Sequence, residues 1–450
     1  MSPRDLGPIF KAYDIRGVVP EQLDEDVARR IGSAFAQWSG APRIAVGRDC
    51  RLSSAPLASA LIEGATSRGV DVWDLGLTST DLVYFASGEL DVPAVSVTAS
   101  HNPPEYNGLK LCLAGAAPVG EETGLAEVRD LAEADRLPPS SSKGRVEERN
   151  LLDAFVEHVL SFVDPGSIAP LTVVADTANG MGGLVVPAVM DRLPVRLVGL
   201  YTELDGTFPN HPADPINPEN QVDLKRTVLE EGADVGMAFD GDADRVFLVD
   251  QRAEGVSGSL VTALVAKAML EREPGATIIH NLICSWVVPE VIKESGGVPV
   301  RTRVGHSFIK QVMAETGAIF GGEHSGHYYF RDNYRADSGL IAGIVALEQM
   351  SRAAKPLSEL LEPFQRYHAS GEINSRVEDQ AGTIERIAER YADGRTDRLD
   401  GLTVEYEDWW FNVRPSNTEP LLRLNVEART PELLEERTDD VLSVIREGAP

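Results

Sequence analysis

The chain has 450 residues, 43% of them hydrophobic and 25% charged, which is the composition of a folded globular protein rather than a disordered one. It carries 70 Asp and Glu against 42 Lys and Arg, a formal net charge of −28. This charge argues against nucleic acid or an anionic membrane as partner, because both bind basic surfaces, but it leaves small anionic substrates open. At roughly 100–200 residues per domain, the length predicts about three or four domains.

Cysteine usage and the apolar runs indicate the compartment. The chain has three cysteines, far apart in the sequence: Cys50, Cys112 and Cys284. This odd number fits neither a disulfide framework nor a zinc site, and we expect a protein of the reduced cytoplasm. Residues 1–16 contain no apolar core of signal-peptide length. The apolar runs at 260–270 and 340–347 are too short to span a bilayer, so we interpret them as buried helices.

In the first third of the chain, short apolar runs that end in turns alternate with stretches of helical spacing. We expect strands at 43–46, 70–75 and 94–98 and a helix at 52–68. A run of Pro, Ser and Lys at 137–143 predicts a linker, and a helix is expected at about 150–163. Strands that alternate with helices indicate an α/β architecture.

The alternation continues through two further units, and the pattern then changes. We expect strands at 171–175 and 234–238 in the second unit, and strands at 277–280, 298–301 and 318–320 with a helix at 307–316 in the third. After Pro356, polar and apolar residues alternate at 402–406, 409–413 and 421–427, and an amphipathic helix follows. This last part is expected to be a smaller α+β domain.

Residues 98–110, which we call the serine loop, follow a predicted strand. α/β proteins place their sites at such strand ends. Ser100, flanked by His101 and followed by Lys110, is a candidate nucleophile or phosphate carrier. Two consecutive prolines stiffen the segment. Taken by itself, a Ser-His pair is more often part of an ordinary serine-rich turn, so this interpretation depends on the other loops.

Residues 240–245, Asp-Gly-Asp-Ala-Asp-Arg, form a second candidate site, the aspartate loop. Its three carboxylates, on Asp240, Asp242 and Asp244, stand on alternate residues of a turn and can converge on one Mg²⁺ ion. Arg245 beside them is suited to clamp a phosphate. The alternative is a solvated acidic turn, but the apolar strand that precedes the segment favours a site.

Two further loops carry polar groups, one suited to sugar hydroxyls and the other to a phosphate. The glycine loop, residues 321–327, offers Glu323 and Ser325 to sugar hydroxyls. The arginine loop, residues 414–420, combines one guanidinium, two hydroxyls and an amide, which together can surround a phosphate. Each loop by itself is equally well explained as an ordinary turn. His306, with Lys310 beyond it, is a weaker candidate, because a lone histidine is more often structural.

The four loops occur in an order that resembles the α-D-phosphohexomutase superfamily, in its phosphomannomutase/phosphoglucomutase branch. Tyr-Asp-Ile-Arg-Gly at 13–17 matches that family too, so the resemblance spans residues 13–420. It implies three similar α/β domains with mixed sheets and a smaller C-terminal α+β domain around a central cleft, each giving one loop. We place these domains at residues 1–143, 144–250, 251–364 and 365–450.

The resemblance also implies the chemistry. Ser100 would be carried as phosphoserine, with Mg²⁺ held by the phosphoserine and the three aspartates, and would pass its phosphoryl group to a sugar monophosphate. The bisphosphorylated sugar would reorient and return its other phosphate; glucose or mannose 1,6-bisphosphate would be the activator. The family positions around the phosphoserine are Arg16, His101, Lys110 and Arg245, with His306 for proton transfer. The binding positions are Glu323, His324, Ser325 and His327 for the sugar and Arg414, Ser416, Asn417 and Thr418 for the phosphate.

Two positions depart from the pattern. Ile283 stands where some relatives have a lysine, so that lysine's role is not carried over, and His324 stands where relatives vary. Asn417 takes the place of a glycine that is usual in the phosphoglucosamine branch, which favours a phosphomannomutase. The alternatives are a phosphoglucosamine mutase, a phosphoglucomutase, a Mg²⁺-dependent sugar phosphatase and a non-enzymatic phosphosugar-binding protein. A monomer or a homodimer is expected.

Overall fold

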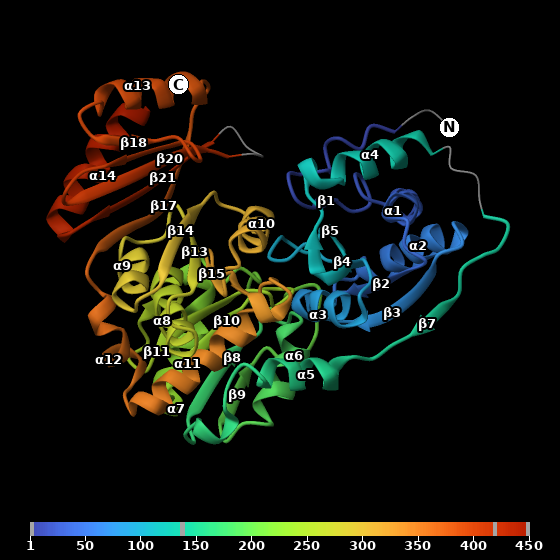
Figure 1. Ribbon diagram of the computed structural model, residues 1–450, viewed down its shortest axis with the longest axis horizontal. Helices are drawn as coiled ribbons and strands as arrows, with labels where there is room; N and C mark the ends of the chain where they lie inside the picture. Colours follow the sequence, from blue (N-terminus) through green and yellow to red (C-terminus); the bar gives the residue numbers. More distant parts are fainter. Residues whose placement is uncertain (1–3, 136–139, 417–420, 447–450) are drawn as a thin grey trace.

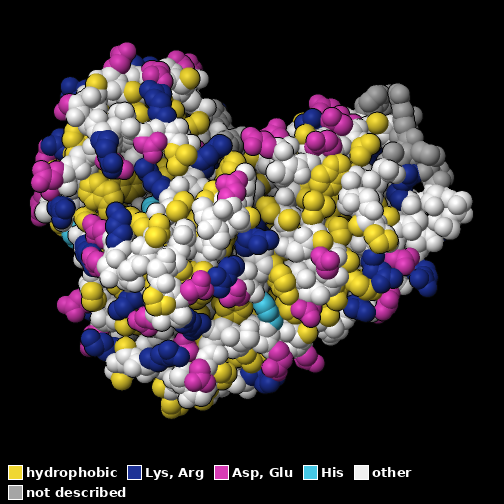
Figure 2. Space-filling model, in the orientation of Figure 1, with side chains coloured by type: hydrophobic (Ala, Val, Ile, Leu, Met, Phe, Trp, Pro, Cys, Tyr) yellow, Lys and Arg dark blue, Asp and Glu magenta, His cyan; other side chains and the backbone are white. Residues whose placement is uncertain are grey.

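The computed structural model describes residues 4–135, 140–416 and 421–446, and for His306 the backbone only. Figure 1 shows the chain arranged in four units, with the first on the right, the second and third on the lower left and the fourth at the upper left. Figure 2 shows the surface indented between the fourth and first units, and acidic and basic side chains mixed over the visible face.

The first unit is a mixed sheet with helices on both faces. The strand order is β1-β5-β4-β2-β3-β7, with β6 beside β5; β2, β3, β4 and β7 run parallel, and β1, β5 and β6 are antiparallel to their neighbours. The strands are β1 (Ile15–Val18), β2 (Arg43–Arg48), β3 (Asp71–Leu77), β4 (Ala94–Val97), β5 (Tyr106–Leu113), β6 (Ala117–Pro118) and β7 (Val146–Glu148). The helices are α1 (Glu25–Ser39), α2 (Ser54–Ser67), α3 (Thr80–Leu90) and α4 (Leu125–Ala134).

Glycines let two of these helices pack closely. A Cβ atom on Gly32 of α1 would lie 2.1 Å from the Leu61 carbonyl oxygen, and one on Gly64 of α2 would lie 2.0 Å from that of Arg29. At its N-terminus α1 is capped by the Asp24 side chain, which accepts from the Val27 amide. The α1–α2 pair therefore forms a close layer on one face of the sheet, while α3 covers the other face.

The second and third units repeat this plan and share one core. Their strand orders are β12-β11-β10-β8-β9 and β14-β13-β15-β16. The strands are β8 (Thr172–Asp176), β9 (Arg196–Leu200), β10 (Val235–Phe239), β11 (Val246–Asp250), β12 (Gly255–Val256), β13 (Thr277–Asn281), β14 (Val298–Thr302), β15 (Phe320–Gly322) and β16 (Tyr328–Phe330). The helices are α5 (Leu152–Leu160), α6 (Gly182–Met190), α7 (Val222–Glu231), α8 (Gly258–Arg272), α9 (Val287–Glu294), α10 (His306–Thr316), α11 (Gly339–Ala353) and α12 (Leu357–Leu361). One apolar cluster runs through both units, so they form a single block.

The fourth unit is a separate antiparallel sheet with its own core. The order is β17-β21-β20-β19-β18. The elements are β17 (His368–Arg376), β18 (Arg395–Asp397), β19 (Leu402–Glu405), β20 (Trp409–Pro415), β21 (Leu421–Ala428), α13 (Gln380–Arg390) and α14 (Pro431–Arg446). Three α/β units and a smaller α+β unit confirm the expected fold class.

Most expected elements are present, with two differences. Strand β5 begins at Tyr106, inside the segment expected to be a loop, because residues 106–113 pair with β1 and β4 on both sides. Strand β7, which was not expected, pairs with β3; the domain boundaries at 143, 250 and 364 stay predictions. The runs at 260–270 and 340–347 are buried in α8 and α11, as expected. No helix in the described part of the chain is long and apolar enough to cross a membrane.

Candidate active site

Ser100 lies three residues beyond the end of β4, in a backbone conformation that serine rarely takes. Its φ angle is +51°, in the left-handed region, and its side chain is almost fully buried. The Ser100 amide donates to Thr98 Oγ1 at 3.0 Å, which stabilises the turn. The hydroxyl faces His101, whose Nδ1 is 3.2 Å away.

The aspartate loop follows β10 and meets Ser100 directly. Ser100 Oγ donates to Asp240 Oδ2 at 2.8 Å. A Cβ on Gly241 would lie 2.4 Å from the Ser100 carbonyl oxygen, so only glycine allows the two loops this close approach. Thr80, the first residue of α3, donates to Asp242 Oδ2 at 2.6 Å. Strand ends of the first and second units thus meet at one buried point.

The three aspartates fit a Mg²⁺ ion. One carboxylate oxygen from each of Asp240, Asp242 and Asp244 lies within 4.8 Å of the others. The Oδ1 atoms of Asp242 and Asp244 are buried and have no hydrogen-bond partner among the described residues. Buried acceptors left unpaired are costly, and a hard cation bound by oxygen ligands would satisfy them.

Lys110 holds two of these carboxylates from β5. Its Nζ donates to Asp242 Oδ2 at 2.7 Å and to Asp244 Oδ2 at 2.6 Å. Burial lowers the pKa of Lys110, but Asp242 and then Asp244 outweigh burial and hold that pKa well above its usual value. Burial raises the pKa of Asp240 to about 7, and the charges of Asp244 and Asp242 add to this effect while Arg245 opposes it. A bound cation would keep Asp240 ionised.

Arginine side chains supply donors beside Ser100. Arg245 Nε donates to Asp240 Oδ2 at 2.9 Å, while its Nη2 is buried without a partner in the described structure. Arg16 donates to Asn102 Oδ1 and to Asp14 Oδ2, and its buried Nε has no described partner. Burial and then the charges of Arg245 and Arg16 lower the pKa of His101 well below its usual range. Unpaired guanidinium donors of this kind suit a phosphate.

The glycine loop lies against the aspartate loop. The backbones of Arg245 and His327 form an antiparallel bridge, and His327 Nδ1 lies 2.8 Å from Asp337 Oδ2. Glu323 is buried and accepts from Tyr329 Oη at 2.6 Å and from Asn281 Nδ2 at 3.0 Å. A carboxylate has further lone pairs, so Glu323 keeps capacity for a sugar hydroxyl.

The remaining residues of the glycine loop are less enclosed. His324 and Ser325 are half-buried, and His324 Nδ1 lies 3.5 Å from Ser259 Oγ. His324 and the buried Ile283 line one cavity of about 110 Å³. At position 283 the chain therefore offers no proton-transfer group.

The arginine loop is described in part. Arg414, at the end of β20, donates through Nη2 to Glu372 Oε2 at 2.6 Å and through Nη1 to Asn425 Oδ1 at 3.3 Å. The Ser416 amide donates to the Leu421 carbonyl at 2.8 Å. Asn417, Thr418 and the His306 side chain lie outside what the structure describes.

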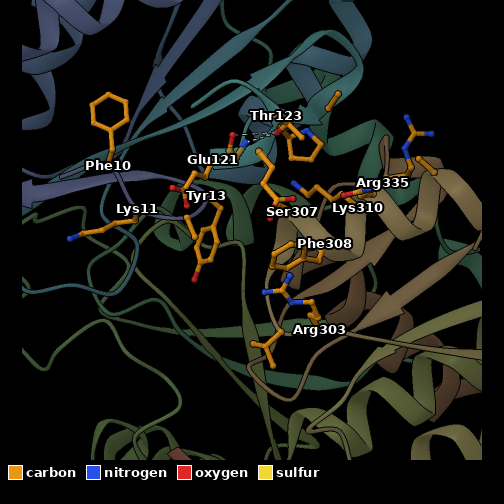
Figure 3. A pocket seen from close by; sticks show the side chains of 18 of the residues that line it. Phe10, Lys11, Tyr13, Glu121, Thr123, Arg303, Ser307, Phe308, Lys310 and Arg335 are labelled. Atoms are coloured by element: carbon orange, nitrogen blue, oxygen red, sulfur yellow. Dashed lines mark hydrogen bonds between the residues drawn. The ribbon is translucent and has the colours of Figure 1, made fainter. Parts of the chain in front are cut away.

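A pocket of about 760 Å³ opens between the first and third units (Figure 3). Tyr13 from the first unit and Ser307 and Phe308 of α10 line it. Ser100 and the aspartates do not, because they are buried. Burial, then Asp14 and more weakly Glu323 of the glycine loop, raise the pKa of Tyr13.

Four side chains that contact the candidate site were not predicted from the sequence: Arg51, Thr80, Asn102 and Asp337. A signal existed for one of them, because Arg51 follows the carboxyl end of β2 just as Ser100 follows that of β4. The other signals were weak, since Thr80 and Asp337 merely precede helical patterns.

Comparisons with known proteins agree with this geometry. Models of the phosphoglucomutase/phosphomannomutase family match the chain in order: α/β/α domain I at residues 7–137, domain II at 153–255, domain III at 257–367 and the C-terminal domain at 372–444. A phosphomannomutase of Salmonella montevideo is 42% identical over 448 residues, covering 97% of this chain and 98% of the relative. A phosphomannomutase of Escherichia coli strain K12 is 42% identical over 450 residues, covering 97% and 99%. The crystal structure of a phosphoglucomutase/phosphomannomutase family protein from Burkholderia thailandensis superimposes with a TM-score of 0.90 at 34% identity, covering 98% and 97%.

Proposed function

The chain belongs to the phosphoglucomutase/phosphomannomutase family, and we propose that it is a phosphomannomutase, which interconverts mannose 6-phosphate and mannose 1-phosphate. The glucose phosphates are a second substrate pair to be tested. The observation that carries the proposal is the buried Ser100 hydroxyl, 2.8 Å from Asp240 and beside two carboxylate oxygens that have no described partner. The names of the relatives point to the mannose phosphates.

In the proposed reaction, Ser100 carries a phosphoryl group. A sugar hydroxyl attacks the phosphorus, and the bond between phosphorus and Ser100 Oγ breaks. Oγ takes up a proton to become the serine hydroxyl again, and the bisphosphorylated sugar forms. The attacking sugar hydroxyl gives its proton to a base, and the family resemblance implies His306 for this role. Asp240, Asp242, Asp244 and the phosphoserine would hold Mg²⁺, which neutralises charge on the phosphoryl oxygens. The unpaired donors of Arg16 and Arg245 bind the same phosphoryl group, since such transfer depends on positioning and charge.

The sugar and its second phosphate are proposed to bind opposite Ser100. Glu323, His324, Ser325 and His327 face the sugar, and Arg414, Ser416, Asn417 and Thr418 hold the distal phosphate. Arg414 is bonded to Glu372, so the phosphate must compete with or join that pair. After the sugar has reoriented, its other phosphate returns to Ser100. Glucose or mannose 1,6-bisphosphate would recharge an enzyme that has lost its phosphoryl group.

A Mg²⁺-dependent phosphatase is the alternative that the same metal site would support. It would transfer the phosphoryl group to water. Hydrolysis would not need a second phosphate site such as the arginine loop, which lies on a separate unit. Accumulation of inorganic phosphate from mannose 1-phosphate, without formation of mannose 6-phosphate, would favour the phosphatase.

The decisive experiment compares three substrates with the purified protein. Mannose 1-phosphate, glucose 1-phosphate and glucosamine 1-phosphate are each supplied with Mg²⁺ and a trace of bisphosphate in a coupled assay. We expect the highest kcat/KM with mannose 1-phosphate, and loss of activity in Ser100→Ala but not in Ser67→Ala, whose hydroxyl only bonds within α2. Preference for glucosamine 1-phosphate, or an active Ser100→Ala variant, would overturn the proposal.

A further inference from the structure

Arg51 stands out as a fully buried arginine that no part of the proposed reaction uses. Its side chain has 0% exposure, although it carries a charge that is costly to bury without partners. It lies just beyond β2, and Asp49 Oδ2 accepts from its Nε at 3.1 Å. The guanidinium also faces the ring of Phe208, 4.9 Å from the ring centre, which brings the second unit over it.

The guanidinium holds the backbone of the serine loop at four points. Arg51 Nη1 donates to the carbonyl oxygens of Pro103 at 2.7 Å and Tyr106 at 3.1 Å. Arg51 Nη2 donates to those of Ser100 at 2.9 Å and Asn102 at 2.7 Å. With the bond to Asp49, every nitrogen of the guanidinium donates. Such a planar set of five N–H donors is special to arginine, because lysine has three donors on one atom.

These bonds act where the backbone is strained. Ser100 has a φ angle of +51°, a conformation that costs energy for serine and persists only when the surroundings impose it. Asn102, whose carbonyl Arg51 holds, accepts from Arg16 through its side chain. Arg51 therefore fixes both Ser100 and the residue that orients Arg16.

We propose that Arg51 is a positioning residue, which holds the serine loop so that the phosphoryl group on Ser100 points at the attacking hydroxyl and at the donors of Arg16. The proposal rests on the proposed function. It assigns no contact with substrate to Arg51, so its loss should damage transfer more than sugar binding. A misplacement of about 1 Å in such a loop costs about 100-fold in rate.

The test replaces Arg51→Lys, which keeps the charge but loses the fork of donors. We expect kcat to fall about 100-fold with little change in KM, because the sugar contacts lie on other loops. The phosphorus NMR shift of the Ser100 phosphate should also move, which a merely stabilising role would not cause. Arg43→Lys is the matched control, since Arg43 lies on β2, the strand that precedes Arg51, but pairs with Asp71.

A folded Arg51→Lys variant with the kcat and phosphorus signal of the wild type overturns the positioning role. If this variant does not fold, Asp49→Asn loosens the same guanidinium, and we expect about a tenfold loss in kcat, as for other supporting residues; an unchanged kcat there overturns the role as well. A wild type that carries no phosphoserine counts instead against the proposed function.

Discussion

At the scale of single residues, the aspartate loop makes a sharp prediction. Asp244→Asn keeps the size of the side chain but removes a charge that Lys110 and a metal ion would share. We expect weaker Mg²⁺ binding by calorimetry and a kcat lower by at least about 100-fold, because a metal ion contributes several kcal/mol to such reactions. Asp191→Asn, an exposed change at the end of α6, is the control. Unchanged Mg²⁺ affinity in Asp244→Asn would place the metal elsewhere.

His280 predicts a pH dependence of stability. It is buried on β13, and burial lowers its pKa to about 4, from 6.5 in the unfolded chain. The neutral form is therefore favoured by folding: its contribution is complete above pH 6.5 and is lost as the pH falls towards 4. Between pH 7 and 5 we expect His280→Gln to lose about 2 kcal/mol less free energy of unfolding than the wild type.

Denaturant unfolding at both pH values measures this difference. His368→Gln, at an exposed position on β17, is the control and should behave as the wild type does. Equal pH dependence in the His280→Gln variant and the wild type would show that another buried group dominates.

Candidate residues could be predicted where a polar motif directly follows a predicted strand, as for Ser100 after β4 and Asp240 after β10. The place of Arg51 after β2 was a signal, but its contacts could not be predicted, because the four carbonyls that this side chain binds come together only when β5 folds back beside β4. Nor could the sequence predict that Asp337 would reach His327, since that pair depends on how α11 begins beside the glycine loop.

At the scale of elements, helix α3 links the first unit to the metal site. Its first residue, Thr80, donates to Asp242 Oδ2 at 2.6 Å, and Asp81 accepts from Ser338 at the start of α11 at 2.7 Å. The start of α3 thus orients Asp242, a candidate metal ligand, and contacts the start of α11. The spacing of apolar residues predicted most strands and helices. Strand β5 was missed because two prolines, Pro103 and Pro104, precede it and indicated a loop.

Thr80→Val tests the role of this helix start. The change removes the hydrogen bond to Asp242, and we expect Mg²⁺ affinity to fall about tenfold, as when other outer contacts of metal ligands are lost. Thr66→Val is the control, because the Thr66 hydroxyl bonds only to its own helix, at Ile62 and Glu63. Equal Mg²⁺ affinity in Thr80→Val and the wild type would contradict this role.

At the scale of the whole molecule, we expect an anionic ligand to bind in spite of the net charge of −28. The reason is local: basic side chains of the site pair with its acidic residues and offset their charge. Lys110 and Arg245 pair with aspartates, and Arg414 pairs with Glu372. These pairs keep the free site near neutrality, and Mg²⁺ would tip it towards binding an anion. The acidic surplus on the visible face mixes with basic side chains (Figure 2).

The fourth unit is packed as a body of its own. It has its own core, while the second and third units share one. Hydrogen bonds tie it to the third unit, through Trp286 to Glu427, Arg301 to Asp397 and Val304 to Asp400. A cavity of about 610 Å³ lies at this junction, so the packing there leaves room for adjustment. We therefore expect Arg414 to approach the first unit by a rotation of the fourth when a ligand binds.

Closure of the cleft is expected when the ligand binds. Ser100→Ala, which prevents turnover, should show a smaller radius of gyration by small-angle X-ray scattering when saturated with mannose 1-phosphate and Mg²⁺. The reason is that one ligand must reach both the aspartate loop and Arg414, which lie on different units. Adding Arg414→Ala to Ser100→Ala should reduce the change, because it removes the contact that draws the fourth unit inward. A radius that stays constant at saturation would mean that the cleft is already closed around its substrate.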